Sequence, residues 1–155
     1  MQYSDVTEWF SSVGEEISID DICKIILETD CDIYVGADSN PSKIPFVLAV
    51  SIAIIKKNKF SKYYYVKLKP WKDKKPGLQK RLYDEVLIAC FVALKIRNRF
   101  PAKKIIVHAD INPDFKTASG KYAKQLKNII MAYGFDAIIK PESWAASSIA
   151  DKHAY

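Results

Sequence analysis

Apolar and polar residues follow one another along the chain in an order that predicts three strands first. Residues 33–37 form a short apolar run, and residues 45–55 are apolar on both faces, as in a central strand. Residues 62–69 alternate between apolar side chains and a face rich in tyrosine and lysine, which predicts a half-buried strand. Because short loops join these segments, we expect an antiparallel meander.

The rest of the chain alternates between helical and strand patterns. Apolar stripes at helical spacing predict an N-terminal helix over residues 19–29 and a long helix over residues 78–98. The later elements are expected as a strand at 103–110, a helix at 121–133, a strand at 135–140 and a terminal helix from 142. We therefore predict one α/β domain over residues 1–155. Its mixed five-stranded sheet would combine a three-strand antiparallel meander with two parallel strands, flanked by helices, and residues 1–30 would add an acidic helical extension.

Charge is distributed unevenly along the chain. Of its 18 acidic and 24 basic residues, nine acids but only one base, Lys24, lie within the first 32 positions. The remaining body is strongly basic, which suits a polyanionic partner such as nucleic acid. A lysine-rich proteome that decorates every surface with lysine is the alternative explanation.

Composition argues against several other classes. The apolar and charged fractions, 49% and 27%, are those of a globular protein in water. We expect no membrane association, because no apolar run approaches the roughly 20 residues of a membrane span and the first residues do not resemble a secretory signal. Three cysteines without a C-x-x-C pair suit a reducing cytoplasm, and a zinc site is not expected.

Acidic residues stand where two of the apolar strands end. Asp38 ends the first strand and Asp110 ends the fourth, so parallel pairing of these strands would bring both acids to one end of the sheet. Glu85 lies on the apolar stripe of the long helix, and Asp151 shares a helix side with Trp144. We therefore expect four acids from four separate segments to converge.

Such a cluster requires neutralisation by protons or cations. Two unit charges about 4 Å apart repel each other by about 4 kcal/mol at an effective dielectric near 20. Oxygen ligands suit Mg²⁺ or Mn²⁺, and a pair of such ions can activate a water and stabilise the leaving oxygen of a phosphodiester. We predict that the catalytic and metal-binding residues are Asp38, Glu85, Asp110 and Asp151.

The order of elements and the positions of these acids resemble the ribonuclease H fold from about residue 31 to residue 155. That family has an Asp in the first strand, a Glu in the first long helix, an Asp ending the fourth strand and an Asp in a late helix. The four predicted acids match this pattern in order. The segments IYVGADS, VHADIN and KPESWAASSIADKHA resemble more closely a bacterial family of predicted RNase H-related nucleases, the YkuK type. NPSKIP stands where the best-known members have a glycine-rich hairpin, and no segment matches their basic handle.

This resemblance implies a nuclease that hydrolyses phosphodiesters with two metal ions in RNA, an RNA–DNA hybrid or structured DNA. In that scheme Asp38 bridges both metal ions, with Asp110 beside it. Glu85 binds the metal ion nearer the leaving group, and Asp151 binds the one that activates water. The alternative is a nucleic-acid-binding or scaffolding module that has the same fold and no catalytic activity.

Each acid also has a purely structural interpretation. Asp38 and Asp110 can serve as turn formers, since Asp is favoured where strands end. Glu85 can be an ion-pair partner of Arg81 one helical turn earlier, and Asp151 can be an ordinary solvated helix residue.

Two histidines and a Ser–Lys combination near the acids have simpler explanations. His153 is interpreted as a tail residue, with proton transfer or product release as its alternative role, and His108 as a core histidine that could also touch the site. Ser147 and Ser148 precede Lys152, but no oxyanion-hole motif accompanies them, so we expect no serine nucleophile.

Lysines and aromatic residues between positions 56 and 75 can follow a nucleic-acid backbone and stack on bases. The alternative is a solvated edge strand that lysines protect against aggregation. Polar residues beside the predicted acids are assigned to the same partner. The predicted nucleic-acid contacts are Lys67, Lys69, Trp71, Lys72, Ser39, Asn40, Ser147 and Ser148.

Overall fold

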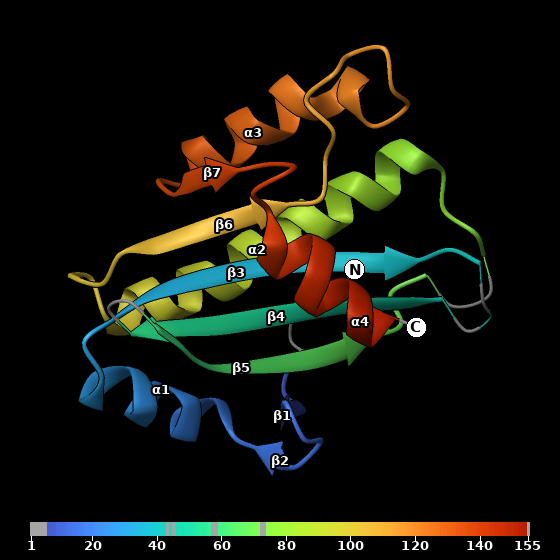
Figure 1. Ribbon diagram of the computed structural model, residues 1–155. Helices are drawn as coiled ribbons and strands as arrows, with labels where there is room; N and C mark the ends of the chain where they lie inside the picture. The colour runs from blue at the N-terminus through green and yellow to red at the C-terminus, as the bar shows by residue number, and fades with distance from the viewer. Residues whose placement is uncertain (1–5, 43, 45, 57–58, 72–73, 155) are drawn as a thin grey trace.

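The computed structural model describes residues 6–42, 44, 46–56, 59–71 and 74–154, excluding the side chains of residues 59–61, 146 and 147. Its strands form one sheet in the order β2-β1-β5-β4-β3-β6-β7 (Figure 1). The strands are β1 (Trp9–Ser11), β2 (Glu16–Ile17), β3 (Cys31–Asn40), β4 (Val47–Lys56), β5 (Lys59–Leu68), β6 (Ile105–Ala109) and β7 (Asp136–Ile138). The helical segments are α1 (Ile19–Glu28), α2 (Leu78–Arg99), η2 (Gly120–Tyr122), α3 (Ala123–Ala132), η3 (Ala145–Ala150) and α4 (Asp151–Ala154).

The predicted centre of the sheet is confirmed. Strands β3, β4 and β5 pair antiparallel in sequence order, as the short connections between them require. Strand β6 then pairs parallel to β3, and β7 pairs parallel to β6, each after a helical crossover. All five strands expected from the sequence are therefore present, with the expected directions.

The prediction of a five-stranded sheet with a purely helical N-terminal extension was wrong in one respect. The extension also contains a β-hairpin, in which β1 pairs with β2 and adds to the sheet beside β5. Gly14 closes its turn with a φ of 84°, a conformation that glycine adopts without steric cost. Strands of three and two residues are too short to show a periodic pattern, so they were not predicted.

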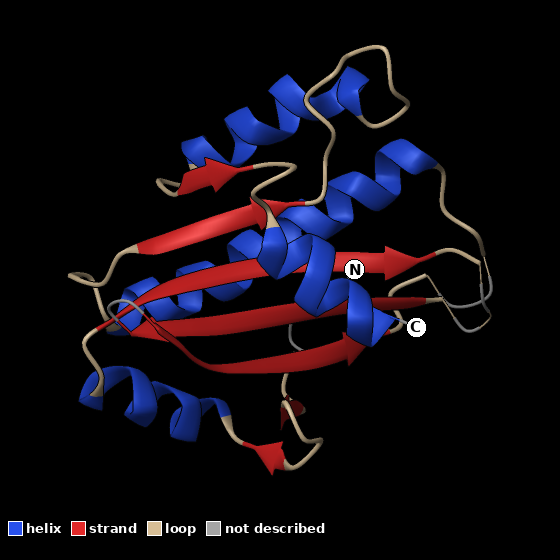
Figure 2. Cartoon of the chain, in the orientation of Figure 1, coloured by secondary structure: helices blue, strands red, loops and turns tan. Residues whose placement is uncertain are grey.

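Helical segments cover the two faces of the sheet. Helix α2 packs along one face, and the C-terminal segment η3–α4 lies across β3 and β4 on the other (Figures 1 and 2). Because side chains alternate along a strand, even-numbered residues of β3, such as Tyr34 and Asp38, face η3–α4. Odd-numbered residues face α2, where Val35 belongs to the main hydrophobic core.

Helix α1 begins and packs as its sequence predicts. Ser18 is the N-cap and its Oγ accepts a hydrogen bond of 3.0 Å from the Asp21 backbone N–H. Buried Ile22 and Ile26 join the main core, and Arg99 from the end of α2 donates a 2.6 Å hydrogen bond to Asp20. In the described part of the chain, no helix has the length and apolar character needed to cross a membrane.

Candidate active site

Parallel pairing of β3 and β6 places Asp38 and Asp110 side by side. The register pairs Gly36 with His108 and Ala37 with Ala109, so the next position in each chain carries the acid. Asp38 is only 6% exposed and lies within the last residues of β3, whereas Asp110 directly follows β6 and is half-buried. Parallel pairing of β3 and β6 therefore places the carboxylates of Asp38 and Asp110 at the same end of the sheet, as their sequence positions predicted.

Glu85 reaches this end of the sheet from α2, on the opposite face to η3–α4. It is 5% exposed, and its Oε1 accepts a 2.6 Å hydrogen bond from the Ser39 hydroxyl. The predicted ion pair with Arg81 is also present, with 3.9 Å between the guanidinium nitrogen and Oε1. Since the same carboxylate interacts electrostatically with Asp38 and Asp110, the Arg81 pair does not account for all its surroundings.

Asp151 approaches from the other face, at the first position of α4. Its carboxylate shares a hydrogen bond with Asp38. This hydrogen bond raises the pKa of Asp38, so it favours a protonated Asp38 that donates to Asp151. Asp38 on β3 thus interacts with each of the other three predicted acids, which come from α2, α4 and the end of β6.

Burial and crowding keep protons on this cluster. Burial raises the pKa of Asp38 to about 9, and the charge of Glu85, the hydrogen bond with Asp151 and the charge of Asp110 act in the same direction. Burial also raises the pKa of Glu85 to about 7, although the Ser39 hydroxyl and Arg81 oppose the rise. Negative charge at this end of the sheet is therefore in excess of the positive charge that the protein supplies to it.

One basic residue not anticipated from the sequence sits in the cluster. Lys140 Nζ lies 3.0 Å from Asp110 Oδ1, but without hydrogen-bond geometry, so this buried oxygen has no hydrogen-bond partner among the described residues. Lys140 follows β7 and is 44% exposed on its side chain. Only the parallel pairing of β6 and β7 brings it to Asp110, and nothing in its local sequence indicates this contact.

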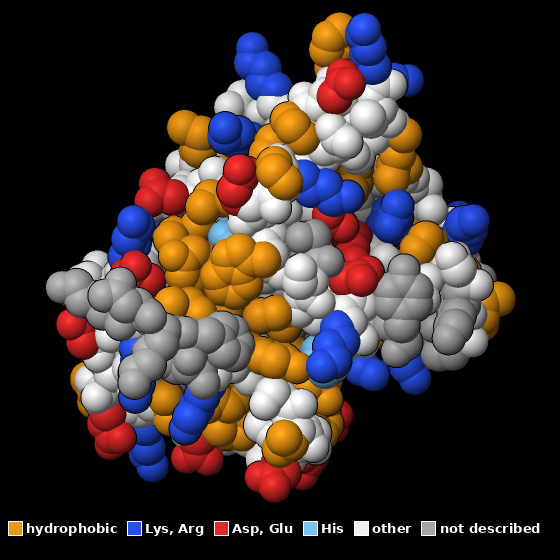
Figure 3. Space-filling model, viewed as in Figure 1, with side chains coloured by type: hydrophobic (Ala, Val, Ile, Leu, Met, Phe, Trp, Pro, Cys, Tyr) orange, Lys and Arg blue, Asp and Glu red, His pale blue; other side chains and the backbone are white. Residues whose placement is uncertain are grey.

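The donor set fits a hard divalent cation in its chemistry. It consists of carboxylate oxygens, one of which lacks a hydrogen-bond partner, and its excess negative charge is held by protons that a cation can replace. In the part of the chain that the structure describes, however, no three His, Cys, Asp or Glu side chains are already arranged around a single ion position. Figure 3 shows acidic side chains gathered beside the C-terminal helical segment, with Lys and Arg side chains around them.

A protein-family model described as Ribonuclease H-like matches residues 17–155. The chain belongs to the ribonuclease H-like family. The match includes all four acids and the whole sheet from β3 to β7, whereas β1 lies before it. Neither the comparison with curated proteins nor the comparison with solved structures produced a match. Family membership indicates a nuclease-type fold, but a fold by itself does not determine which reaction its residues catalyse.

The segment that carries Asp151 is fixed at its start by His108. This histidine is 1% exposed, and its Nδ1 accepts a 3.0 Å hydrogen bond from the Ala145 backbone N–H. Its ring also contacts Tyr34 and Trp144, and burial lowers its pKa to about 4. A neutral histidine that accepts at Nδ1 is the core histidine expected from the sequence, and it holds η3 against the sheet.

The residues predicted to contact nucleic acid fall into different environments. Lys67, Lys69 and Ser148 are exposed, whereas Ser39 and Asn40 are 4% and 1% exposed. The Ser39 hydroxyl is occupied by Glu85, and Asn40 Oδ1 accepts from the Ser42 backbone N–H. These two residues therefore organise the end of β3 in the structure. Lys72 and the side chain of Ser147 lie outside the described residues.

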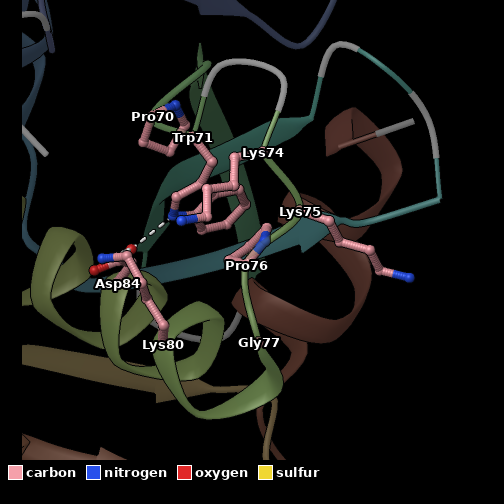
Figure 4. A pocket seen from close by; sticks show the side chains of 8 residues that line it. All are labelled: Pro70, Trp71, Lys74, Lys75, Pro76, Gly77, Lys80 and Asp84. Carbon is pink, nitrogen blue, oxygen red and sulfur yellow. Dashed lines mark hydrogen bonds and ion pairs between the residues drawn. The ribbon is translucent and has the colours of Figure 1, made fainter.

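Trp71 forms part of a basic pocket next to the acidic site. The pocket has a volume of about 370 Å³, and its walls include the rings of Pro70, Trp71 and Pro76 (Figure 4). Trp71 itself is 7% exposed, because its indole Nε1–H donates a 2.6 Å hydrogen bond to Asp84. The rest of the lining consists of three lysines, Lys74, Lys75 and Lys80, together with Gly77 and Asp84.

This pocket and the carboxylate cluster lie on neighbouring sides of α2. Asp84 and Glu85 are consecutive, so their side chains project about 100° apart around the helix. Lys80 Nζ lies 3.2 Å from Asp84 Oδ2, and together with Trp71 it partners the buried acid. No pocket was predicted here, although Asp84 follows a segment, PWKDKKPG, that is rich in lysine and contains Trp71.

Proposed function

We propose that this chain is a metal-dependent nuclease that hydrolyses phosphodiester bonds in nucleic acid. The observation that carries the proposal is the meeting of Asp38 with three acids from separate elements, at a site with more negative charge than the protein neutralises. An acid cluster with a purely structural role would lower the free energy of unfolding, because each buried charge loses its hydration. Membership of the ribonuclease H-like family supports the same conclusion.

Mg²⁺ or Mn²⁺ would be held by Asp38, Glu85, Asp110 and Asp151. When bound, a pair of these ions supplies an activated water and stabilises the leaving oxygen of the phosphodiester. Ser39 and Arg81 hold the Glu85 carboxylate in place from the α2 side of the sheet. We also propose that the chain is of the YkuK type within its family, because the segments IYVGADS, VHADIN and KPESWAASSIADKHA resemble that type.

Nucleic acid would approach along the basic side chains near the cluster. Exposed Lys67 and Lys69 lie at the end of β5, and Lys67 is close enough to α4 to influence the charge state of His153. The lysines of the Trp71 pocket continue this basic surface around α2. Such side chains bind phosphates without regard to base sequence, so we expect affinity to depend strongly on salt.

A cleavage panel tests the proposed activity directly. Single-stranded RNA, single-stranded and duplex DNA, an RNA–DNA hybrid and a branched DNA junction would each be incubated with the protein in Mn²⁺ and in EDTA. We expect cleavage of at least one substrate in Mn²⁺, and its loss in Asp38→Asn and Asp110→Asn. Asp136→Asn is the matched control, because Asp136 is an exposed acid at the start of β7. Cleavage that survives in Asp38→Asn would contradict the proposed mechanism.

One observation favours a second candidate, a nucleic-acid-binding module without catalysis. Lys140 and Arg81 already approach Asp110 and Glu85, and basic partners of this kind can satisfy acids permanently. If this is their role, the protein binds nucleic acid equally well in EDTA and in Mn²⁺ and cleaves none of the substrates in the panel. Neither Mg²⁺ nor Mn²⁺ then raises its melting temperature.

A further inference from the structure

Three aromatic rings from distant parts of the chain stack in series beside the acidic site. The His153 and Tyr65 rings are nearly parallel, at 8°, with centroids 3.5 Å apart. Phe10 stacks on Tyr65 with a centroid separation of 5.8 Å and an angle of 29°. His153 Nε2 also lies 3.0 Å from the Tyr63 hydroxyl, within hydrogen-bond distance. The His153 ring is thus held both by stacking on Tyr65 and by the polar contact with the Tyr63 hydroxyl.

The series connects the N-terminal hairpin to the helix that carries Asp151. Phe10 in β1 and Tyr65 in β5 are direct partners in the sheet register, so their side chains lie on the same face. His153 follows Asp151 by two positions within the four residues of α4. Phe10 lies outside residues 17–155, so the ring series includes an element that the family match does not cover.

Helix α4 continues directly from η3, which His108 and Ser51 hold at Ala145, so the far end of the segment depends on contacts beyond that anchor. A helical segment as short as η3–α4 has little intrinsic stability, and its position depends on tertiary contacts. Its small residue Ala154 packs with Ala150 and with Ala49 of β4. These methyl contacts set how closely the segment approaches the sheet, but small side chains do little to fix its rotation. The His153 contacts with Tyr63 and Tyr65 resist rotation about the helix axis.

We propose that His153 is a positioning residue that holds Asp151 at Asp38, and that Phe10 supports it through Tyr65. The inference rests on the proposed metal-dependent function. The carboxylate of Asp151 has to be held beside Asp38 to bind the same ions, and the ring series fixes the one-turn helix that presents it. The N-terminal hairpin is therefore part of the apparatus that shapes the site.

Variants of the ring series test this inference through metal binding as well as activity. Melting temperature would be measured over a Mn²⁺ titration for His153→Ala, His153→Phe, Phe10→Ala and the parent. We expect His153→Ala to raise the Mn²⁺ concentration for half-maximal stabilisation about tenfold, as loss of a ligand-orienting partner does. His153→Phe keeps the stacking and stays within about threefold of the parent. Phe10→Ala shifts the midpoint in the same direction as His153→Ala, by a smaller factor.

Two controls separate positioning from general stability and from failure of the proposed function. Phe115→Ala removes an aromatic ring that is 71% exposed and leaves the Mn²⁺ midpoint unchanged. A His153→Ala protein that melts earlier without metal but keeps the parent midpoint and kcat would overturn the positioning role. Asp38→Asn is measured in parallel. If it keeps the parent's Mn²⁺ response, the proposed function fails; if it loses that response while His153→Ala keeps it, only the positioning inference fails.

Discussion

The Ser39 hydroxyl donates a 2.6 Å hydrogen bond to Glu85 Oε1 and thereby connects β3 to α2 beneath the acidic site. Ser39 is adjacent to Asp38 in the chain, and its side chain points to the opposite face of the sheet. The strand therefore presents one acid to α4 while it orients a second acid on α2. Both partners of this hydrogen bond are buried.

Ser39→Ala should destabilise the protein and change the charge state of Glu85. Loss of a buried hydrogen bond to a carboxylate costs about 1–3 kcal/mol of unfolding free energy. Because the Ser39 hydrogen bond lowers the pKa of Glu85, its removal should raise that pKa further. Urea denaturation in EDTA measures the loss. Ser148→Ala is the control, because that serine is exposed, and an equal loss in both variants would contradict the role of Ser39.

Stability without divalent ions should fall as pH rises. The folded pKa of Asp38 is about 9, against an ordinary value of 3.8. Below about pH 4 both folded and unfolded states hold this proton; between that pH and about 9 only the folded state keeps it. The unfolding free energy therefore decreases across this window, by about 1.4 kcal/mol per pH unit at most for one proton.

Asp38→Asn isolates the contribution of this carboxyl group. An amide stays neutral at every pH, so the variant should lose part of the slope between pH 5 and pH 9 in EDTA. At pH 8 it should be more stable than the parent, although it lacks a proposed catalytic acid. Urea midpoints at pH 5, 7 and 9 provide the comparison. Parallel curves for parent and variant would mean that Asp38 is ordinarily ionised in the folded protein.

Lys140→Ala should strengthen binding of Mn²⁺. The ammonium lies 3.0 Å from Asp110 Oδ1 and competes there with any cation. Since the Lys140 side chain is 44% exposed, water screens the pair, and we expect only a twofold to fivefold gain, corresponding to about 1 kcal/mol or less. Isothermal titration calorimetry with Mn²⁺ measures it, with Lys124→Ala on the exposed side of α3 as control. Weaker binding in Lys140→Ala would show that the lysine assists the site instead.

Removal of two lysines from the Trp71 pocket should weaken nucleic-acid binding in a salt-dependent way. For the double variant Lys74→Ala/Lys75→Ala, the slope of log Kd against log salt should decrease by about two, one for each lost phosphate contact. Fluorescence anisotropy of a labelled oligonucleotide in EDTA excludes cleavage during the measurement. The control is Lys124→Ala/Lys127→Ala, which removes the same charge from α3. Equal slopes in the two double variants would indicate that only net charge matters.

Strand parity and helical periodicity were sufficient to predict the centre of the fold and the meeting of the acids. Asp38 and Asp110 each end an apolar run, and parallel pairing of such runs places their ends together. Glu85 was recognisable as a charge on an apolar helical stripe. Such patterns are local or repeat at short intervals, so they can be recognised in one sequence without knowledge of the tertiary structure.

Contacts between distant segments could not be predicted in the same way. Lys140 meets Asp110, and His153 meets Tyr65, only because of tertiary pairing that leaves no mark in the surrounding residues. The assignment of His153 as a tail residue shows the difficulty, since its ring is packed against two tyrosines. The hairpin that carries Phe10 was not predicted because strands of three and two residues are too short to show a periodic pattern.

The response of melting temperature to Mn²⁺ at pH 8 tests the central claim most directly. At a concentration a hundredfold above Kd, the ion should raise the melting temperature of the parent by about 5 °C or more. Asp136→Asn should respond equally, whereas Asp38→Asn and Asp110→Asn should respond little or not at all. An unresponsive parent, or an Asp38→Asn protein stabilised as much as the parent, would contradict the proposal that these acids form a metal site.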